Sequence, residues 1–262
     1  MKILIYILYD FITCKFSYYR NKSNILYKLI LNFINKGFIL STEASFVNMY
    51  FFSKHKLNIE YETKEFWNQF LNENNILTPN IYIKNDILKN KQYIIKPNIG
   101  IHGNDIEIKK FKDINFIDEF LVQDLLKDEY VNYARSFRII TIYDGTCLLI
   151  FEMINKYKIT SNIHSGGICK YLCLNNSFLS KEETIKIKII TNKLCKIHKY
   201  KLDNIFSIGW DVMFNKKQLY VLEGNVRVPG IILTTQNNYD YTKYFHKYIK
   251  KAMIFDNKYK VC

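Results

Sequence analysis

The chain has 262 residues, of which 48% are hydrophobic and 16% aromatic, and its formal net charge is +14. This length and apolar content allow a sizeable core in one two-lobed unit or two small domains, and they exclude a disordered protein. The six cysteines form no CxxC pair, so we expect reduced thiols rather than a structural zinc site.

The positive charge taken alone suggests a nucleic-acid or anionic-membrane partner. However, only four of the 38 basic residues are arginines, and the lysines are spread along the whole chain. The chain is also rich in Ile, Lys, Asn, Tyr and Phe, which an A+T-rich genome encodes most readily. We therefore expect no specific nucleic-acid partner.

The N-terminal run MKILIYILYDFITCKF is apolar but short, because Asp10 interrupts it. Such a run cannot span a bilayer, and no small-residue cleavage site follows it. We expect a buried strand or helix here, a mostly helical segment over residues 1–60, and a cytoplasmic protein with no membrane span.

Residues 61–124 are predicted to form a first lobe. Thr63 can cap a helix over KEFWNQFLNE, because its hydroxyl can accept a bond from the first helical turn. QYIIKP predicts a short strand that Pro97 ends, NIGIHG a glycine loop, and FLVQDLL a strand that runs into a loop.

Residues 125–262 are predicted to form a second lobe. FRIITIY and TCLLIFEMI read as strands joined at Asp144 and Gly145, a hairpin signal. Ser180 with Glu183 forms a capping box that begins a helix. SIGWDVMF and QLYVLEGN are the last two predicted strands, and residues 241–255 predict a closing amphipathic helix.

The last two predicted strands carry the sharpest chemical feature. Side chains alternate along a strand, so Glu223 and Asn225 share a face, and a hairpin loop over 216–218 places Asp211 opposite Glu223. Like charges directly opposite are destabilising unless something compensates them, and Mg²⁺ prefers such oxygen ligands. The alternative is two exposed acids on a surface hairpin; apolar neighbours on both strands favour a half-buried sheet and a metal site.

Two further motifs carry positive charge. In IIKPNIGIHG, Lys96 precedes a glycine loop whose free backbone N–H groups suit a polyphosphate, although the pattern is not a P-loop. In SFRIIT, Arg138 lies in a strand between apolar residues and needs an anionic partner. That partner is either a structural carboxylate or a phosphate or carboxylate of a substrate.

Together these motifs resemble the ATP-grasp superfamily, most closely the branch found with sugar-transferase and polysaccharide genes. The resemblance covers roughly residues 60–235 and rests on TKEFWNQFLNENNILTP, IIKPNIGIHG, FLVQDLL, SFRIIT, NIHSGG and IGWDVMF…YVLEGNVRVPG in that order. It implies an α+β fold in which two α+β lobes clasp ATP, preceded by the short helical segment.

The resemblance also implies ATP and Mg²⁺ as cofactors and a set of site residues. Lys96 and Arg138 would act on the transferred phosphoryl group. The metal ligands would be Asp211, Glu223 and Asn225. The nucleotide would be bound by the phosphate-contacting, loop, base and ribose residues Lys64, Lys96, Gly100, Gly103, Gln123, Asp124, Leu125, Leu126, Asp128, Asn162, Gly166 and Gly167.

The implied reaction makes an acylphosphate from a carboxylate and ATP, and an amine then displaces the phosphate to form an amide. We therefore expect a carboxylate–amine ligase that acts on small-molecule or glycan-linked substrates, with polysaccharide or cell-surface glycan modification implied by the branch alone. The alternatives are a catalytically degenerate or regulatory nucleotide-binding protein, an ATP-grasp kinase for small molecules, and a basic nucleic-acid-binding protein.

Overall fold

The computed structural model describes residues 57–83, 91–99, 106–114, 119–157, 160–161, 166–172, 179–227 and 229–230, with a few positions between 48 and 55 and between 247 and 258. The predicted site residues Gly100, Gly103 and Asn162 lie outside the described residues. So do nearly all of the predicted N-terminal helical segment and most of the predicted C-terminal helix.

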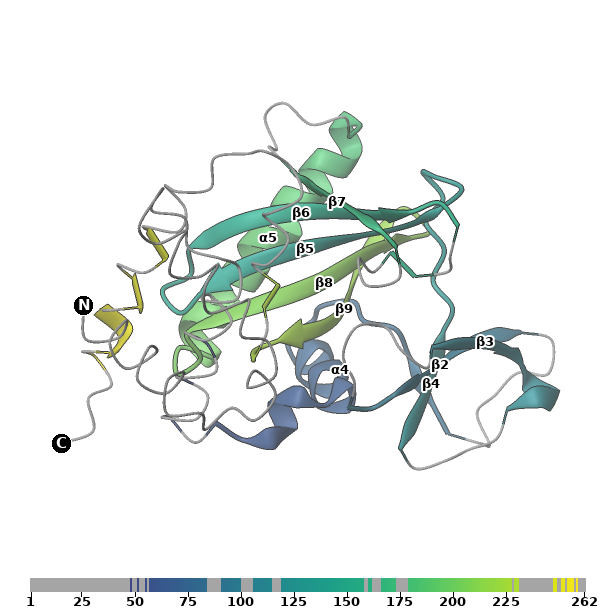
Figure 1. Ribbon diagram of the computed structural model, residues 1–262, viewed down its shortest axis with the longest axis horizontal. Helices are drawn as coiled ribbons and strands as arrows, with labels where there is room; N and C mark the ends of the chain where they lie inside the picture. Colours follow the sequence, from purple (N-terminus) through teal and green to yellow (C-terminus); the bar gives the residue numbers. More distant parts are fainter. Residues whose placement is uncertain are drawn as a thin grey trace, which may run out of the picture.

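The described chain forms two antiparallel sheets and two α-helices (Figure 1). The four-stranded sheet has the order β1-β4-β2-β3, with bounds Ile81–Tyr82, Phe120–Asp124, Gln92–Pro97 and Glu107–Lys110. The five-stranded sheet has the order β7-β6-β5-β8-β9, with bounds Ile168–Tyr171, Cys147–Asn155, Ala134–Ile142, Ser207–Asn215 and Gln218–Asn225. This confirms the predicted α+β fold class with two sheets, the architecture that the ATP-grasp resemblance implies.

The two α-helices begin at the predicted caps. The Thr63 hydroxyl accepts a bond from the backbone N–H of Phe66, at the start of α4 (Lys64–Glu73). The Ser180 and Glu183 side chains form the complete capping box of α5 (Lys181–Lys201). Short 3-10 turns, η2 (Ile59–Glu62) and η4 (Phe111–Asp113), complete the described elements. Local side-chain bonds therefore fix where both helices start.

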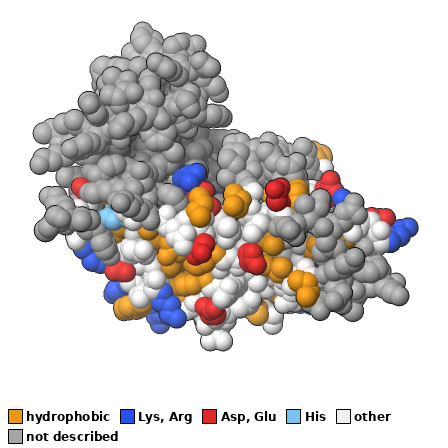
Figure 2. Space-filling view, turned by 90° about the horizontal axis from the view of Figure 1, so that it is seen from below, with side chains coloured by type: hydrophobic (Ala, Val, Ile, Leu, Met, Phe, Trp, Pro, Cys, Tyr) orange, Lys and Arg blue, Asp and Glu red, His pale blue; other side chains and the backbone are white. Residues whose placement is uncertain are grey.

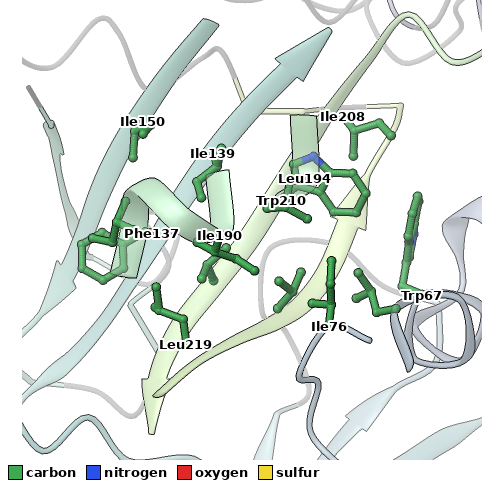
Figure 3. Packing of buried hydrophobic residues seen from close by; sticks show 14 of the residues in the cluster. Trp67, Ile76, Phe137, Ile139, Ile150, Ile190, Leu194, Ile208, Trp210 and Leu219 are labelled. Atoms are coloured by element: carbon green, nitrogen blue, oxygen red, sulfur yellow. The ribbon is translucent and has the colours of Figure 1, made fainter. Parts of the chain in front are cut away.

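The five-stranded sheet is covered on both faces. On one face, α5 and α4 pack against buried strand residues that include Phe137 and Trp210, and Leu194 is among the α5 residues in this cluster (Figure 3). The opposite face holds a second apolar cluster that includes Ile140, Phe151 and positions from the C-terminal part of the chain. Side chains alternate between the two faces along β5 and β8. Arg138 and Asp211 lie next to residues of the first cluster in the sequence, so they point to the second face.

Helix α4, which was predicted as part of the first lobe, packs on the five-stranded sheet. Trp67 is fully buried beside Trp210, with their ring centroids 5.2 Å apart. Gly224 of β9 makes room for this, because a Cβ there would lie 2.9 Å from the Trp67 ring. In Figure 1, α4 lies between β9 and the smaller sheet. The boundaries 1–60, 61–124 and 125–262 stay a prediction.

The β8–β9 hairpin differs from the predicted loop yet keeps the predicted pairing. The turn has two residues, Lys216 and Lys217, both with positive φ (48° and 58°), and Asn215 pairs with Gln218. A two-residue turn alone would shift the register by one. A β-bulge between Asp211 and Val212 restores it, so Asp211 pairs with Glu223 as predicted.

Candidate functional site

An arginine–carboxylate pair on the five-stranded sheet forms the base of the candidate site. Arg138 on β5 pairs directly with Asp211 on β8. The guanidinium donates from Nε to Asp211 Oδ1 (2.6 Å) and from Nη2 to Oδ2 (2.8 Å), which is a bidentate fork. It also donates from Nη1 to the carbonyl of Pro229 (3.1 Å). Arg138 is therefore paired with a carboxylate of the protein, and two of its N–H groups are not used in these bonds.

Two glycines allow the chain after β9 to lie against this pair. A Cβ on Gly209 would lie 2.0 Å from the Pro229 carbonyl oxygen. Gly230 has a φ of +85°, and a Cβ there would lie 2.6 Å from Arg138 Nη1. Larger residues would push the Pro229 carbonyl away from the guanidinium. Pro229 is a site residue that was not predicted from the sequence, although it lies within the VRVPG motif.

The second carboxylate and the amide come from β9. Glu223 pairs with Asp211, and Asn225 pairs with Gly209 two residues further on. Asn225 Nδ2 donates to Asp211 Oδ2 (3.3 Å) and to the Gly209 carbonyl (3.2 Å), so its amide oxygen is the atom left to face a cation. The three predicted metal ligands thus lie together on one face.

Two lysines reach the acid pair from outside the five-stranded sheet. Lys64, in the first turn of α4, places Nζ 3.7 Å from Glu223 Oε2. Lys96, on β2, is buried and lies near enough to both acids for them to raise its pKa. Burial is the larger influence and lowers the pKa of Lys96 overall, with Lys64 adding to the fall. The site therefore lies where the two sheets approach each other.

Among the described side chains of this cluster, three cations (Lys64, Lys96, Arg138) face two carboxylates. Burial raises the pKa of Asp211 and Glu223 adds to the rise, while Arg138 opposes it. Burial also acts to raise the pKa of Glu223, but Lys96, Lys64 and Arg138 together hold it below its usual range.

The donor set fits a hard divalent cation. It consists of two carboxylates at paired positions and one amide, all half-buried. Each carboxylate has about four lone-pair sites, so Asp211 can hold Arg138 and still accept a metal ion. Among the described residues, no group of three or more His, Cys, Asp and Glu is placed to hold a metal, so a site here depends on the Asn225 amide.

The strand β4 supplies an unusual buried amide. Gln123 is 1% exposed, and neither polar atom of its side chain has a hydrogen-bond partner among the described residues. Gln123 lies opposite Ile94 in the ladder, so the two side chains are on the same face of the small sheet. Lys96 is two residues after Ile94 on β2 and therefore also lies on this face. An unmet buried donor and acceptor cost roughly 1–3 kcal/mol each, which a polar ligand on this face would recover.

The two acids predicted near the ribose are both bonded within the protein. Asp124 accepts from Tyr82 (2.9 Å) and forms an ion pair with Lys91. Asp128 is fully buried and accepts from Arg135 Nε (2.7 Å) and from the backbone N–H of Tyr130 (2.9 Å). Asp128 thus holds Arg135 in place, and its predicted contact with the ribose stays a prediction.

The remaining predicted positions are placed as follows. Leu125 and Leu126 follow β4 in the connection to β5, with Leu126 buried. Gly166 has a φ of +90° with open space around it, and Gly167 is buried just before β7. A glycine is required at the first of these positions because other residues rarely adopt that conformation.

No protein-family model and no curated protein matches the sequence. Among solved structures, the ATP-grasp ligase PsnB with its minimal precursor has a TM-score of 0.49 at 15% identity, over 72% of this chain and 60% of that one. The D-alanine–D-alanine ligase of Bacillus anthracis with ATP has 0.47 at 16%, over 76% and 68%. D-cycloserine synthetase DcsG has 0.48 at 9%, over 75% and 71%. These are distant likenesses, so the chemistry of the site rests on its own geometry.

None of the described helices is long and apolar enough to cross a membrane.

Proposed function

We propose that the protein binds Mg-ATP where its two sheets meet and uses it to activate a carboxylate for attack by an amine, as a carboxylate–amine ligase. One observation carries the proposal: five elements bring cations and oxygen ligands to one place. Their side chains are Lys64 of α4, Lys96 of β2, Arg138 of β5, Asp211 of β8, and Glu223 with Asn225 of β9.

The cations have separable roles in this proposal. Lys64 and Lys96 contact the phosphate oxygens of the nucleotide, since ammonium groups bind such oxygens with charge-assisted bonds. Arg138 uses three of its five N–H groups on Asp211 and Pro229, and it offers the remaining two to the phosphoryl group. Arg138 therefore positions Asp211 as well as neutralising charge.

Asp211, Glu223 and Asn225 would hold Mg²⁺, which when bound supplies a Lewis acid that neutralises charge on the phosphate oxygens. The opposed carboxylates face each other across paired strands, where like charges repel. The adjacent cations offset this repulsion within the protein alone, and a metal ion would offset it further.

The base-binding part of the proposal rests on β4 and the residues after it. The unmet amide of Gln123 lies on the Lys96 face, and the backbone of Leu125 and Leu126 follows directly. We assign this segment to the adenine and Asp124 to the ribose. Gly100 and Gly103 are proposed to cover the phosphates, and Asn162, Gly166 and Gly167 to lie near the transferred group.

We further propose small-molecule carboxylate and amine substrates and a cytoplasmic location. Glycan-linked substrates rest on the branch resemblance alone. The nucleic-acid alternative is less favoured, because acidic and basic side chains are interspersed on the described part of the face in Figure 2. A degenerate nucleotide-binding protein and a small-molecule kinase are separated from the ligase by the assays below.

Nucleotide binding is the first test. Calorimetry with ATP and with GTP, with and without Mg²⁺, should give Mg-dependent ATP binding that Lys96→Ala reduces at least about tenfold. Lys109→Ala is the matched control, because this lysine of the same sheet pairs with Glu107 away from the acid pair. The proposal would be contradicted if neither nucleotide bound, or if Lys96→Ala and Lys109→Ala lowered the affinity for ATP equally.

Turnover is the second test. A panel of carboxylates with and without amines is screened for ADP release, and hydroxylamine is added to trap an acylphosphate as a hydroxamate. The ligase predicts carboxylate-dependent ADP release, a trapped hydroxamate, and loss of both in Glu223→Gln. ADP release that depends on a hydroxyl compound and gives no hydroxamate would indicate the kinase; binding without turnover would indicate a degenerate protein.

A further inference from the structure

Asn98 connects the end of β2 to the first turn of α4. Its carbonyl accepts a bond from the backbone N–H of Lys64 (3.0 Å). Its side chain accepts from the backbone N–H of Glu65 (3.1 Å) and donates to the Glu65 carboxylate (3.4 Å). The start of a helix has N–H groups without partners inside the helix. Asn98 therefore satisfies two of them from 33 and 34 residues away in the sequence.

The same residue is tied to the small sheet. The backbone N–H of Asn98 donates to the carbonyl of Glu119 (2.8 Å), and Asn98 directly follows Pro97, the last residue of β2. Helix α4, in contrast, packs on β9 of the large sheet through Trp67. Asn98 thus joins the small sheet to an element that belongs with the large one.

This junction fixes the spacing of the two lysines of the site. Lys64 Nζ lies 3.5 Å from the Asn98 carbonyl and 3.7 Å from Glu223 Oε2. Lys96 precedes Asn98 by two residues on the same strand end. If the junction loosened, α4 with Lys64 would stay on the large sheet, while Lys96 would move with the small sheet.

We propose that Asn98 is a positioning residue that keeps Lys64 and Lys96 directed at the same bound polyphosphate. This inference rests on the proposed function, because it names how that site holds its anion. Asn98 contributes no charge and acts through the two lysines. The loss of its side chain should therefore weaken nucleotide binding more than it weakens the fold.

Asn58 offers a matched control. It makes the same two side-chain contacts with Glu60, accepting from the backbone N–H (3.1 Å) and donating to the carboxylate (2.7 Å). These contacts are local, two residues apart, and cap the 3-10 turn η2, which ends at Glu62 and does not contact Asn98 through them. Asn58→Ala therefore removes the same chemistry without loosening the junction between the sheets.

The first measurement needs no nucleotide. Amide hydrogen exchange at Glu65 should rise roughly three- to tenfold in Asn98→Ala, since one hydrogen bond is lost. Exchange at Glu60 should rise in Asn58→Ala while Glu65 is unchanged there. Unchanged exchange at Glu65 in Asn98→Ala would overturn the proposal whatever the nucleotide data show.

The second measurement is the Kd for Mg-ATP by calorimetry. We expect Asn98→Ala to raise it about tenfold and Asn58→Ala to leave it within about twofold. The double variant Asn98→Asp with Glu65→Gln exchanges donor and acceptor at constant net charge, and it should recover most of the affinity. A Kd for Asn98→Ala within about twofold of wild type overturns the positioning role and leaves the proposed function standing. Failure of the wild type to bind Mg-ATP overturns the proposed function, and the positioning role with it.

Discussion

Removal of Arg138 should destabilise the protein through Asp211. In Arg138→Ala the bidentate bonds of 2.6 and 2.8 Å disappear, and a carboxylate that is 13% exposed remains beside Glu223. Breaking a buried ion pair by removing one partner costs about 3–5 kcal/mol. The lower end applies here, because both side chains retain some exposure and Asn225 still donates to Asp211 at 3.3 Å. We expect a loss of about 3 kcal/mol in the free energy of unfolding.

The loss should depend on pH. Burial already raises the pKa of Asp211, and without Arg138, which lowers it, the pKa rises further. A folded-state pKa above the unfolded value of about 3.9 means that the folded protein binds the proton more tightly. Stability is then retained at low pH and lost as the pH rises through the folded-state pKa. The deficit of Arg138→Ala should therefore be larger near about pH 8 than near about pH 5.

Urea unfolding at these two pH values measures the effect. Arg227→Ala is the control, because Arg227 pairs with Glu62 (3.2 Å) while 42% exposed, and such surface pairs contribute about 0–1 kcal/mol. Arg138→Ala combined with Asp211→Asn should recover part of the stability, since no charge is left buried. A deficit equal to that of the Arg227 control, or one that grows as the pH falls, would refute the role assigned to Arg138.

Three further predictions concern the fold around the site. Burial lowers the pKa of His198 from 6.5 to about 4, so the free energy of unfolding should fall by up to about 3 kcal/mol as the pH drops through this window. In His198→Gln the free energy of unfolding by urea should depend less on pH; the same pH dependence as in the wild type would contradict this. Deletion of Leu222, the extra residue of the bulge, should leave a regular ladder in which Glu223 still lies opposite Asp211, so Mg-ATP binding should be retained; loss of binding with native-like circular dichroism would show that the bulge itself shapes the site. Gly224→Ala should lower the free energy of unfolding by about 1–3 kcal/mol, because its Cβ would lie 2.9 Å from the Trp67 ring. The added change Trp67→Leu should relieve that clash in the double variant. An unaltered urea midpoint in Gly224→Ala would count against the packing of α4 on β9.

The sequence alone determined the starts of both α-helices, the strands that carry the site and the identity of the metal-ligand candidates. Thr63 and Ser180 mark the helix starts because capping is a bond between residues two or three apart. The period of two along strands places Glu223 and Asn225 on one face for the same local reason. These features depend on near neighbours in the chain, so the printed residues suffice to predict them.

The tertiary structure decided the register, the packing of α4 and the partners of the charged groups. The Lys216–Lys217 turn has an unfavourable positive φ at both residues, and bonds from distant elements hold it, among them the Glu129 carboxylate on the Lys217 N–H (3.3 Å). Asp128 became a partner of Arg135 and Asn98 a cap for α4 through contacts across the fold. Such contacts depend on how sheets and helices pack, and packing energy is shared among many residues far apart in the sequence, so no local pattern encodes it.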